Sequence, residues 1–274
     1  MSGTLYLCPT PIGNLEDITL RTVRILSEVD LIAAEDTRHS LILLNHLKIK
    51  KPLVSYFEHN KLMRGKEILE HLKNGKNVAL ITDAGTPAIS DPGEDLVMQC
   101  IEENIEVIPL PGANAAITAL IASGISTGRF AFQGFLSMNK TARREHLQSV
   151  SSYTDTLIFY EAPHKLLNTL NDFLEILGNR NIALCRELTK THEEKIRCTV
   201  EEAIALYSEK PPKGEYVIIV EGAVFDPSKE FEAFTLEELY EKYLSEGLSD
   251  KDALKKAAKN KGISKRDAYA KIKT

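Results

Sequence analysis

The run from Val78 to Gly93, VALITDAGTPAISDPG, constrains the fold more than any other part of the chain. Val78 to Ile81 are continuously apolar, which is typical of a strand covered on both faces of a sheet. A loop rich in Gly, Pro and Asp follows directly, with Gly85 leaving room for a ligand beside the backbone. Because open α/β sheets bind ligands at the carboxyl ends of their strands, this loop is a candidate site. An ordinary strand–turn–helix connection would give the same pattern.

Two further strand-to-loop junctions have the same character. The apolar segment Thr4–Cys8 precedes the loop Pro9–Thr19, and Glu106–Pro109 precedes Leu110–Ala116. Three such junctions in one parallel sheet would line one crevice. Neither GxGxxG nor GxxxxGK[ST] occurs, so the usual dinucleotide and P-loop motifs are absent.

Strand and helix patterns alternate through the first half of the chain. Helical spacing between two of the strands, at Leu20, Val23, Leu26 and Val29, predicts one of the helices. This βαβα rhythm predicts a parallel sheet covered by helices. The candidate strands begin near Thr4, Leu31, Leu53, Asn77 and Glu106.

The second half has a different rhythm, which by itself predicts only the α/β class. A small-residue helix near Ala113–Gly124 would join the halves, and Val224–Lys229 is a plausible linker after the second. The predicted strands are Phe130–Gln133, Thr156–Tyr160, Ile182–Arg186 and Tyr216–Val220, and the predicted helices are Lys165–Leu177 and Thr199–Ser208.

Seven motifs, spread in order over nearly the whole chain, resemble those of the tetrapyrrole methylase superfamily. Within it, they are most similar to the branch that methylates small-subunit ribosomal RNA. The motifs are Pro9–Leu15, Ala34–Arg38, Thr82–Gly93, Pro111–Asn114, Phe159–His164, Arg186–Glu194 and Gly214–Gly222.

The resemblance implies a two-domain fold of the class III S-adenosylmethionine (SAM) methyltransferases with a small, all-helical C-terminal module. It implies an N-terminal α/β domain over residues 1–113 and a second α/β domain over 114–223 that completes the SAM cleft. Residues 231–274 would form a basic, helical RNA-docking module. The implied reaction is 2′-O-methylation of a cytidine in the decoding region of 16S ribosomal RNA, within the small ribosomal subunit, by a homodimer.

The superfamily pattern also places the SAM pocket, where small side chains and backbone groups at strand ends would hold the cofactor. The implied cofactor-binding residues are Ile12, Asp83, Gly85, Ala88, Ile89, Ser90, Ala115, Ala162, Cys185 and Tyr216.

Ionisable groups just beyond strand ends are the candidates for catalysis. A ribose 2′-hydroxyl is a weak acid, so a base or a cation beside its oxygen should assist transfer. Lys190 acts as the base if burial lowers its pKa, and Glu187 is either the base or the partner that holds the lysine. Asp36 is a third candidate. An interdomain or surface ion pair is the alternative for each of them.

The net charge of −5 conceals a basic C-terminal segment. Residues 248–274 hold nine Lys or Arg against three Asp, which suits a nucleic-acid-binding module on an acidic body. Leu248–Leu254 and Ile263–Tyr269 repeat one pattern, an apolar residue followed by a capping serine and an acid at N3, and Gly262 suits the end of the first helix. A solvated helical hairpin is the alternative. The candidate RNA contacts are Arg38, Arg186, Lys255, Lys259, Lys265 and Arg266.

Other sequence features narrow the functional class. The four cysteines have no CxxC spacing and no histidine lies in a metal-binding motif, so we expect no metal. No apolar run approaches the roughly 18 residues of a membrane span, and no signal pattern precedes the first strand, so we expect a cytoplasmic protein without a membrane partner. Two other functions compete: a tetrapyrrole methyltransferase of the same superfamily, and a non-catalytic ribosome-assembly factor.

Overall fold

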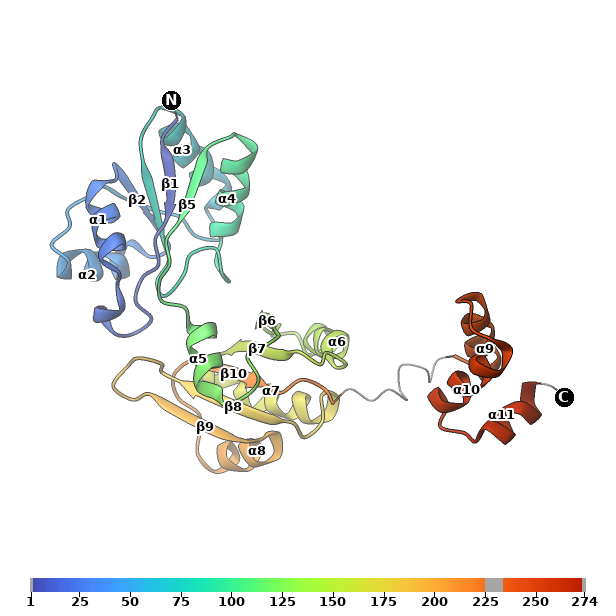
Figure 1. Cartoon of the computed structure of the whole chain (residues 1–274). Coiled ribbons are helices and arrows are strands. Elements are labelled where there is room, and N and C mark those ends of the chain that lie inside the picture. Colours follow the sequence, from blue (N-terminus) through green and yellow to red (C-terminus); the bar gives the residue numbers. More distant parts are fainter. Residues whose placement is uncertain (1, 225–233, 273–274) are drawn as a thin grey trace. The chain divides into compact units, whose positions relative to one another are not determined.

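The computed structural model describes residues 2–224 and 234–272 (Figure 1). The chain divides into two compact units, Met1–Ala223 and Val224–Thr274. Most of the predicted linker Val224–Lys229 and the first residues of the module predicted from 231 lie outside the described residues.

The first sheet is parallel throughout and has the strand order β3-β2-β4-β1-β5. Its central strands β2 and β4 are buried at every position, as the unbroken apolar runs predict. The strands are β1 (Thr4–Leu7), β2 (Leu31–Ala34), β3 (Leu53–Ser55), β4 (Val78–Ile81) and β5 (Glu106–Pro109).

Helices cover both faces of this sheet, α1 and α2 on one side and α3 and α4 on the other (Figure 1). The predicted helix between β1 and β2 forms, but Leu20 at its first position is 90% exposed and Ile25 packs inward instead. The helices are α1 (Leu20–Glu28), α2 (Thr37–His46), α3 (Lys61–Lys73) and α4 (Gly93–Glu102), with a 3-10 turn, η1, at Leu15–Asp17.

The second sheet is mixed, with the order β6-β7-β10-β8-β9. Only β6 and β7 are parallel, and the remaining neighbours run antiparallel. The edge strand β9 and the helix α6 had no predicted counterpart. The strands are β6 (Phe130–Phe135), β7 (Thr156–Glu161), β8 (Asn181–Arg186), β9 (Glu194–Thr199) and β10 (Tyr216–Val220).

One face of the second sheet packs on three helices around Phe159 and Phe173, and the other face packs on α5 alone. This helix follows β5 and connects the two sheets (Figure 1). The helices are α5 (Ala115–Ser123), α6 (Lys140–Val150), α7 (Pro163–Ile176) and α8 (Val200–Glu209).

In the smaller unit, the described residues 234–272 form three helices, α9 (Leu236–Ser245), α10 (Asp250–Asn260) and α11 (Lys265–Ile272). They bury a core of their own, built around Leu239, Tyr243 and Leu254. The sequence patterns predicted α10 and α11 but not α9. With two α/β sheets and a helical C-terminal unit, the predicted fold class is confirmed.

The serine caps of the smaller unit form, but not as complete capping boxes. The hydroxyl of Ser249 accepts the backbone N–H of Asp252 at 3.3 Å and donates to that residue's carboxylate at 2.6 Å. Ser264 and Asp267 repeat both bonds. Aspartate is one carbon shorter than the glutamate of a capping box, so its carboxylate meets the hydroxyl rather than the backbone. Gly262, at φ +64°, ends α10 as predicted.

Candidate functional site

A cavity of about 320 Å³ lies where the carboxyl ends of the first sheet's strands meet the second sheet. Its walls come from the loops after β1, β4 and β5 and from β7, β8 and β10. We call it the cofactor cavity because eight of the ten predicted cofactor-binding residues line it. These eight are Ile12, Asp83, Gly85, Ile89, Ser90, Ala115, Cys185 and Tyr216.

Hydrogen bonds between loops hold the first-sheet side of the cavity together. Thr10 and Gly85 exchange backbone bonds at 2.9 and 3.0 Å, and the Thr10 hydroxyl donates to the carbonyl of Thr82. Gly85 has φ +87°, where a side chain is strained, and an added Cβ would lie 3.3 Å from Ile12 Cγ2. The Thr86 hydroxyl donates to the carbonyl of Ala113. The three loops therefore form one rigid edge.

Backbone strain gathers in the loop after β4. Ala88 and Ser90 have φ +67° and +63°, a region that costs a non-glycine residue about 1–2 kcal/mol. Asp91 holds this shape, because one carboxylate oxygen accepts the N–H groups of Ala88 and Gly93 at 3.0 and 2.7 Å. Ala88, a predicted cofactor residue, shapes the loop without lining the cavity.

The second carboxylate oxygen of Asp91 is buried and has no hydrogen-bond partner among the described residues. Burial raises the pKa of Asp91, and the Glu35 carboxylate raises it further, although the backbone N–H groups of Gly93 and Ala88 oppose both effects. Asp91 also lines the cavity. A buried polar atom without a partner at a concave surface is available to a ligand.

A second strained loop faces the first across the cavity. Glu187 and Thr189, in the connection from β8 to β9, have φ +50° and +66°. Gly13 and Gly214 allow this loop to pack closely. A Cβ on Gly13 would lie 2.4 Å from Lys190 Cγ, and one on Gly214 would lie 2.6 Å from Glu187 Cγ. Such clusters of strained residues mark functional sites.

Lys190 and Glu187, two of the predicted catalytic residues, form an ion pair that lines the cavity. The Lys190 ammonium donates to Glu187 Oε1 at 3.0 Å and lies 4.0 Å from Glu215 Oε2. Burial raises the pKa of Glu187, but hydrogen bonds from Lys190 and the Glu215 N–H outweigh it, so the net shift is downward. Glu187 is therefore ionised at neutral pH.

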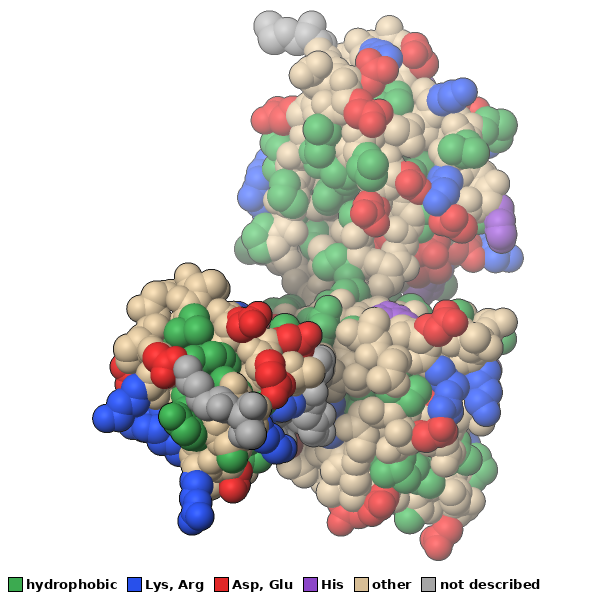
Figure 2. All heavy atoms as spheres, turned by 90° about the vertical axis from the view of Figure 1, so that its right-hand side faces the viewer, with side chains coloured by type: hydrophobic (Ala, Val, Ile, Leu, Met, Phe, Trp, Pro, Cys, Tyr) green, Lys and Arg blue, Asp and Glu red, His purple; other side chains and the backbone are tan. Residues whose placement is uncertain are grey.

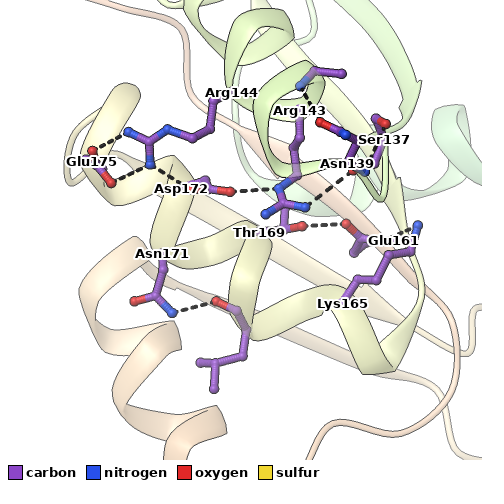
Figure 3. Close-up of polar contacts among 12 residues, drawn as sticks. Ser137, Asn139, Arg143, Arg144, Glu161, Lys165, Thr169, Asn171, Asp172 and Glu175 are labelled. Carbon is purple, nitrogen blue, oxygen red and sulfur yellow. Dashed lines mark hydrogen bonds and ion pairs between the residues drawn. The ribbon is translucent and has the colours of Figure 1, made fainter.

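Glu161 forms the floor of the cavity, where it is 1% exposed. Its carboxylate accepts the Thr169 hydroxyl at 2.6 Å and the N–H of Ala162 at 2.9 Å, with Lys165 Nζ 3.4 Å away (Figure 3). Ala162, a predicted cofactor residue, thus begins α7 beside the cavity without lining it.

A buried ion-pair network behind Glu161 fixes α7 against α6. Arg143 donates to Asp172 at 2.7 Å and to the Ser137 carbonyl at 3.3 Å, and Arg144 joins Asp172 to Glu175 (Figure 3). Removing one partner of such a buried pair is strongly destabilising. The network therefore stiffens the support of the cavity floor.

The cavity wall also has an apolar part. Burial raises the pKa of Cys185 to about 11, so this thiol stays protonated and acts as a small apolar side chain. Tyr160 packs edge-on against Phe132 and Phe135. An apolar wall opposite a polar loop is the usual composition of a small-molecule pocket.

The other predicted site residues lie away from the cofactor cavity. Hydrogen bonds from Arg38 hold the pKa of Asp36 well below its usual range, and Arg38 itself is 89% exposed. The backbone N–H of Asp36 donates to Asp83 at 3.1 Å, so Asp36 orients a cavity residue without lining the cavity. Arg186 donates to Glu194 at 3.0 Å.

In the helical unit, basic side chains project from the surface (Figure 2). The four predicted RNA contacts there, Lys255, Lys259, Lys265 and Arg266, are all exposed on α10 and α11. The predicted cofactor and catalytic residues thus line one cavity, apart from Ala88, Ala162 and Asp36. The four predicted RNA contacts on α10 and α11 lie in the separate unit.

Phe135 lines the cavity but lies in none of the seven motifs and among none of the predicted site residues. Tyr160 and Glu215 lie within two of the motifs, Phe159–His164 and Gly214–Gly222, but were assigned no role. Tyr160 lies near the end of its strand, so the rule applied to the first sheet could have identified it. The fold places Glu215 beside Lys190, which the chain order does not reveal.

Carboxylates dominate the charge of the cavity. Six of them line it, and Lys190 is the sole Lys or Arg among the described lining residues. The walls therefore favour a cationic or neutral ligand over an anionic one. The carboxylates are Glu35, Asp83, Asp91, Glu161, Glu187 and Glu215.

Within residues 2–224 and 234–272, no three His, Cys, Asp or Glu side chains gather in a way that would hold a metal ion. Over the same ranges, no helix has the length and apolar character needed to cross a membrane.

Comparisons with known proteins agree on one family. The family model for tetrapyrrole (corrin/porphyrin) methylases matches residues 4–204. A protein of Halalkalibacterium halodurans named ribosomal RNA small subunit methyltransferase I is 52% identical over 97% of this chain and 93% of its own. One of the same name from Thermotoga maritima is 49% identical over 80% of this chain and 99% of its own.

The fold has solved counterparts as well. A crystal structure of uroporphyrin-III-C-methyltransferase from Thermus thermophilus superposes with a TM-score of 0.57, covering 80% of this chain and 94% of that one. At 21% sequence identity this likeness concerns the fold, and it confirms the predicted tetrapyrrole-methylase architecture.

Proposed function

The chain belongs to the tetrapyrrole methylase family, and from this membership we propose that it methylates small-subunit ribosomal RNA. Proteins of this family take the methyl group from SAM, so SAM is the cofactor of this chain. In full, the proposed reaction is 2′-O-methylation of a cytidine ribose in the decoding region of 16S ribosomal RNA. The relatives named for this RNA, matched over almost the whole chain, support the proposal.

The residues present fit SAM. The cavity of about 320 Å³ lies within the usual range for small-molecule pockets. Ala115 and Cys185 offer small apolar surfaces for an adenosyl group, and Gly85 keeps the backbone accessible. SAM carries a sulfonium and an ammonium against one carboxylate, so a wall of carboxylates complements its net positive charge. Asp91, with its unpartnered oxygen, adds a polar contact.

Bound SAM supplies an electrophilic methyl group, and the Lys190–Glu187 pair is proposed to assist the chemical step. The ammonium of Lys190 can stabilise negative charge that develops on a ribose 2′-oxygen. Glu187 holds Lys190 at 3.0 Å and takes up the role of base or of orienting partner. Asp36 would act indirectly, because its backbone N–H donates to Asp83 and orients that carboxylate.

The names of the relatives are the observation that carries the choice of acceptor. Two proteins named ribosomal RNA small subunit methyltransferase I are 52% and 49% identical to this chain over 97% and 80% of its length. The solved uroporphyrin-III-C-methyltransferase shares 21% of its sequence with the chain. The higher identity to the RNA enzymes supports RNA over a tetrapyrrole as the substrate.

Contacts to RNA phosphates are assigned to basic groups outside the cavity. Two of them, Arg38 and Arg186, would attract the RNA backbone from the main unit. The other four, on the helical unit, are Lys255, Lys259, Lys265 and Arg266. The Thermotoga maritima relative matches over 99% of its own length but 80% of this chain, so a protein of that name can be shorter. We therefore assign the helical unit to affinity rather than to chemistry.

The proposal extends to a cytoplasmic homodimer that acts on the small ribosomal subunit. The edge strand β6 leaves Phe130 exposed, and Met138 is exposed just beyond the end of the strand. Apolar groups on an open sheet edge are a frequent site of protein contact. Light scattering of the purified protein would test the dimer, and a monomer at all concentrations would contradict it.

The decisive experiment is methylation with labelled SAM. Small ribosomal subunits that lack the modification, naked 16S ribosomal RNA and tetrapyrrole precursors are offered separately. We expect label on the subunit, mapped to a cytidine 2′-oxygen. Label on a tetrapyrrole would support the alternative enzyme, and SAM binding without transfer to any substrate would support the non-catalytic assembly factor.

A further inference from the structure

A second cavity, of about 480 Å³, borders the cofactor cavity on the side of η1 and α2. The two cavities share six lining residues, and Lys190 is one of them. Its ammonium lies between Glu187 and Glu215, and Glu215 also lines both cavities. The residues of this shared wall are Ile12, Thr82, Asp83, Ala84, Lys190 and Glu215.

Ser40 lines the second cavity but not the first. It is 4% exposed, and its hydroxyl has no hydrogen-bond partner among the described residues. A serine inside a helix can donate to the carbonyl four residues earlier, here that of Asp36, but the Ser40 hydroxyl does not. A buried hydroxyl without a hydrogen-bond partner lowers stability. Because Ser40 lines a cavity, a ligand bound there can supply the missing partner.

Asp83 supplies a second polar group, with the opposite hydrogen-bonding character. One of its carboxylate oxygens accepts the Asp36 N–H at 3.1 Å and lies 3.8 Å from His39 Nδ1. The other oxygen forms no hydrogen bond within the part of the chain that the structure describes. The carboxylate is therefore oriented, with one acceptor left for a ligand.

A hydroxyl donor and a carboxylate acceptor match the edge of cytosine. Cytosine presents an amino donor beside the acceptors N3 and O2, and a carboxylate is the side chain that accepts from this amino group. Uracil has an oxygen in place of the amino group, which would face the Asp83 carboxylate and be rejected. Pro11 and Leu15 add apolar surface for the ring.

We propose that the second cavity receives the acceptor cytidine, extruded from the RNA strand, and that Asp83 and Ser40 read its base. Enzymes that modify nucleotides commonly take the target out of its stack into such a pocket. With the base in the second cavity, the ribose lies toward the shared wall, where Lys190 and the cofactor cavity meet. This inference rests on the proposed function and specifies the substrate site.

The first test is Ser40→Ala in the full chain. Because the hydroxyl has no partner in the protein, its removal should leave the melting temperature equal or raise it. Calorimetric affinity for SAM should stay at the parental value. Single-turnover methylation of unmodified small subunits should slow by about tenfold, the worth of one hydrogen bond. Ser27→Ala is the control, since that exposed helical hydroxyl donates to the Val23 carbonyl at 2.9 Å.

The second test measures base preference. Small subunits carrying cytidine or uridine at the acceptor position are compared as substrates. We expect Ser40→Ala to lower the ratio of the methylation rate with cytidine to the rate with uridine. Asp83→Asn should shift the preference toward uridine, because an amide can donate to the uracil O4. The ratio of the two rates separates base reading from any general loss of activity.

Three outcomes would overturn the inference. One is parental methylation by Ser40→Ala, and another is an unchanged base preference in both variants. The third is loss of SAM affinity in parallel with activity, which would assign these residues to the cofactor. In each case the parental enzyme still methylates a cytidine ribose, so the proposed function survives. If the parental enzyme transfers no methyl group to RNA, the proposed function fails first.

Discussion

The loops around the cavities and the helical C-terminal unit differ in backbone strain and in how completely their buried polar groups are hydrogen-bonded. At the cavities, four non-glycine residues have positive φ, and three buried polar atoms, on Ser40, Asp91 and Thr189, lack partners. In the described part of the C-terminal unit, residues 234–272, positive φ occurs at Gly247 and Gly262, and no such orphan atom is found.

Charge separates the same two regions. The cofactor cavity is walled by carboxylates, whereas the C-terminal unit exposes lysines on helices that are capped by Ser249, Ser264 and a complete capping box at Thr235. Strain and unsatisfied groups persist only where the surroundings impose them. In the main unit, strained residues and unpartnered polar groups therefore lower stability at the proposed ligand sites. In the C-terminal unit, the capped helices are locally stable and carry the exposed positive charge.

The largest effect should come from Gly85→Leu. The side chain would occupy the space that the backbone leaves for SAM, and affinity should fall by at least about 100-fold. The positive φ of +87° also costs roughly 1–2 kcal/mol of stability. Calorimetry measures the affinity and thermal unfolding measures the stability.

Gly178→Leu is a matched control, because Gly178 has φ +85° with nothing within 4 Å of an added Cβ. It should lose the same stability and keep its affinity for SAM. If the two variants bind SAM equally, the Gly85 loop is strained for structural reasons alone, and the cofactor site lies elsewhere.

Lys190→Ala should act on the chemical step. Removing the ammonium from the shared wall should lower kcat by about 100-fold while SAM affinity persists. Lys195→Ala is the control, since Lys195 pairs with Glu193 outside both cavities. Single-turnover methylation at the parental rate in Lys190→Ala would make Lys190 a structural residue.

Neutralising the C-terminal unit should change RNA affinity and leave SAM binding unaffected. Four Gln substitutions, at Lys255, Lys259, Lys265 and Arg266, should weaken RNA binding, and the slope of affinity against salt should become shallower by about 3. Binding isotherms at several salt concentrations measure both. Four Gln substitutions at exposed lysines of the main unit serve as the control, at Lys66, Lys140, Lys210 and Lys213.

An equal affinity and an equal slope in the substituted and parental proteins would contradict the assignment. The unit would then be a structural element, and the RNA-binding surface would have to lie in the main unit, beginning with Arg38 and Arg186.

The strands of the first sheet were predictable because a covered parallel strand leaves an unmistakable apolar run, as in Val78–Ile81. The edge strand β9 was not, since its exposed positions carry charges such as Lys195 and Arg197 that obscure the alternation. The face of α1 was misjudged at Leu20, because helical spacing does not identify which apolar residues lie outside the core.

The site divides in the same way. Residues within loops that follow strand ends, such as Gly85 and Lys190, could be located from the chain order. Ser40 could not, because only the folded structure reveals that its buried hydroxyl has no hydrogen-bond partner. The strain at Glu187 and Thr189 was equally invisible, since it results from close packing against Gly13 and Gly214, which are distant in sequence.

The smallest effect, and the sharpest contrast between the two regions, should come from changing one aspartate to asparagine in each. Burial raises the pKa of Asp91 in the folded protein, so its ionised form lowers stability at every pH above that folded pKa. Asp91→Asn keeps an oxygen for the Ala88 and Gly93 N–H groups and removes the charge, so the melting temperature at pH 8 should rise by about 1 °C. As the pH falls through the folded pKa toward the ordinary aspartate value, the parental carboxyl takes up its proton and the gain should vanish.

Asp252→Asn should instead lower the melting temperature at pH 8, because it removes a negative charge from the first turn of α10. Thermal unfolding of both variants at pH 8 and pH 4 measures the contrast. A loss of stability in both at pH 8 would mean that the Asp91 carboxylate is as well satisfied as a helix cap, and that the unpartnered oxygen is no mark of a binding site.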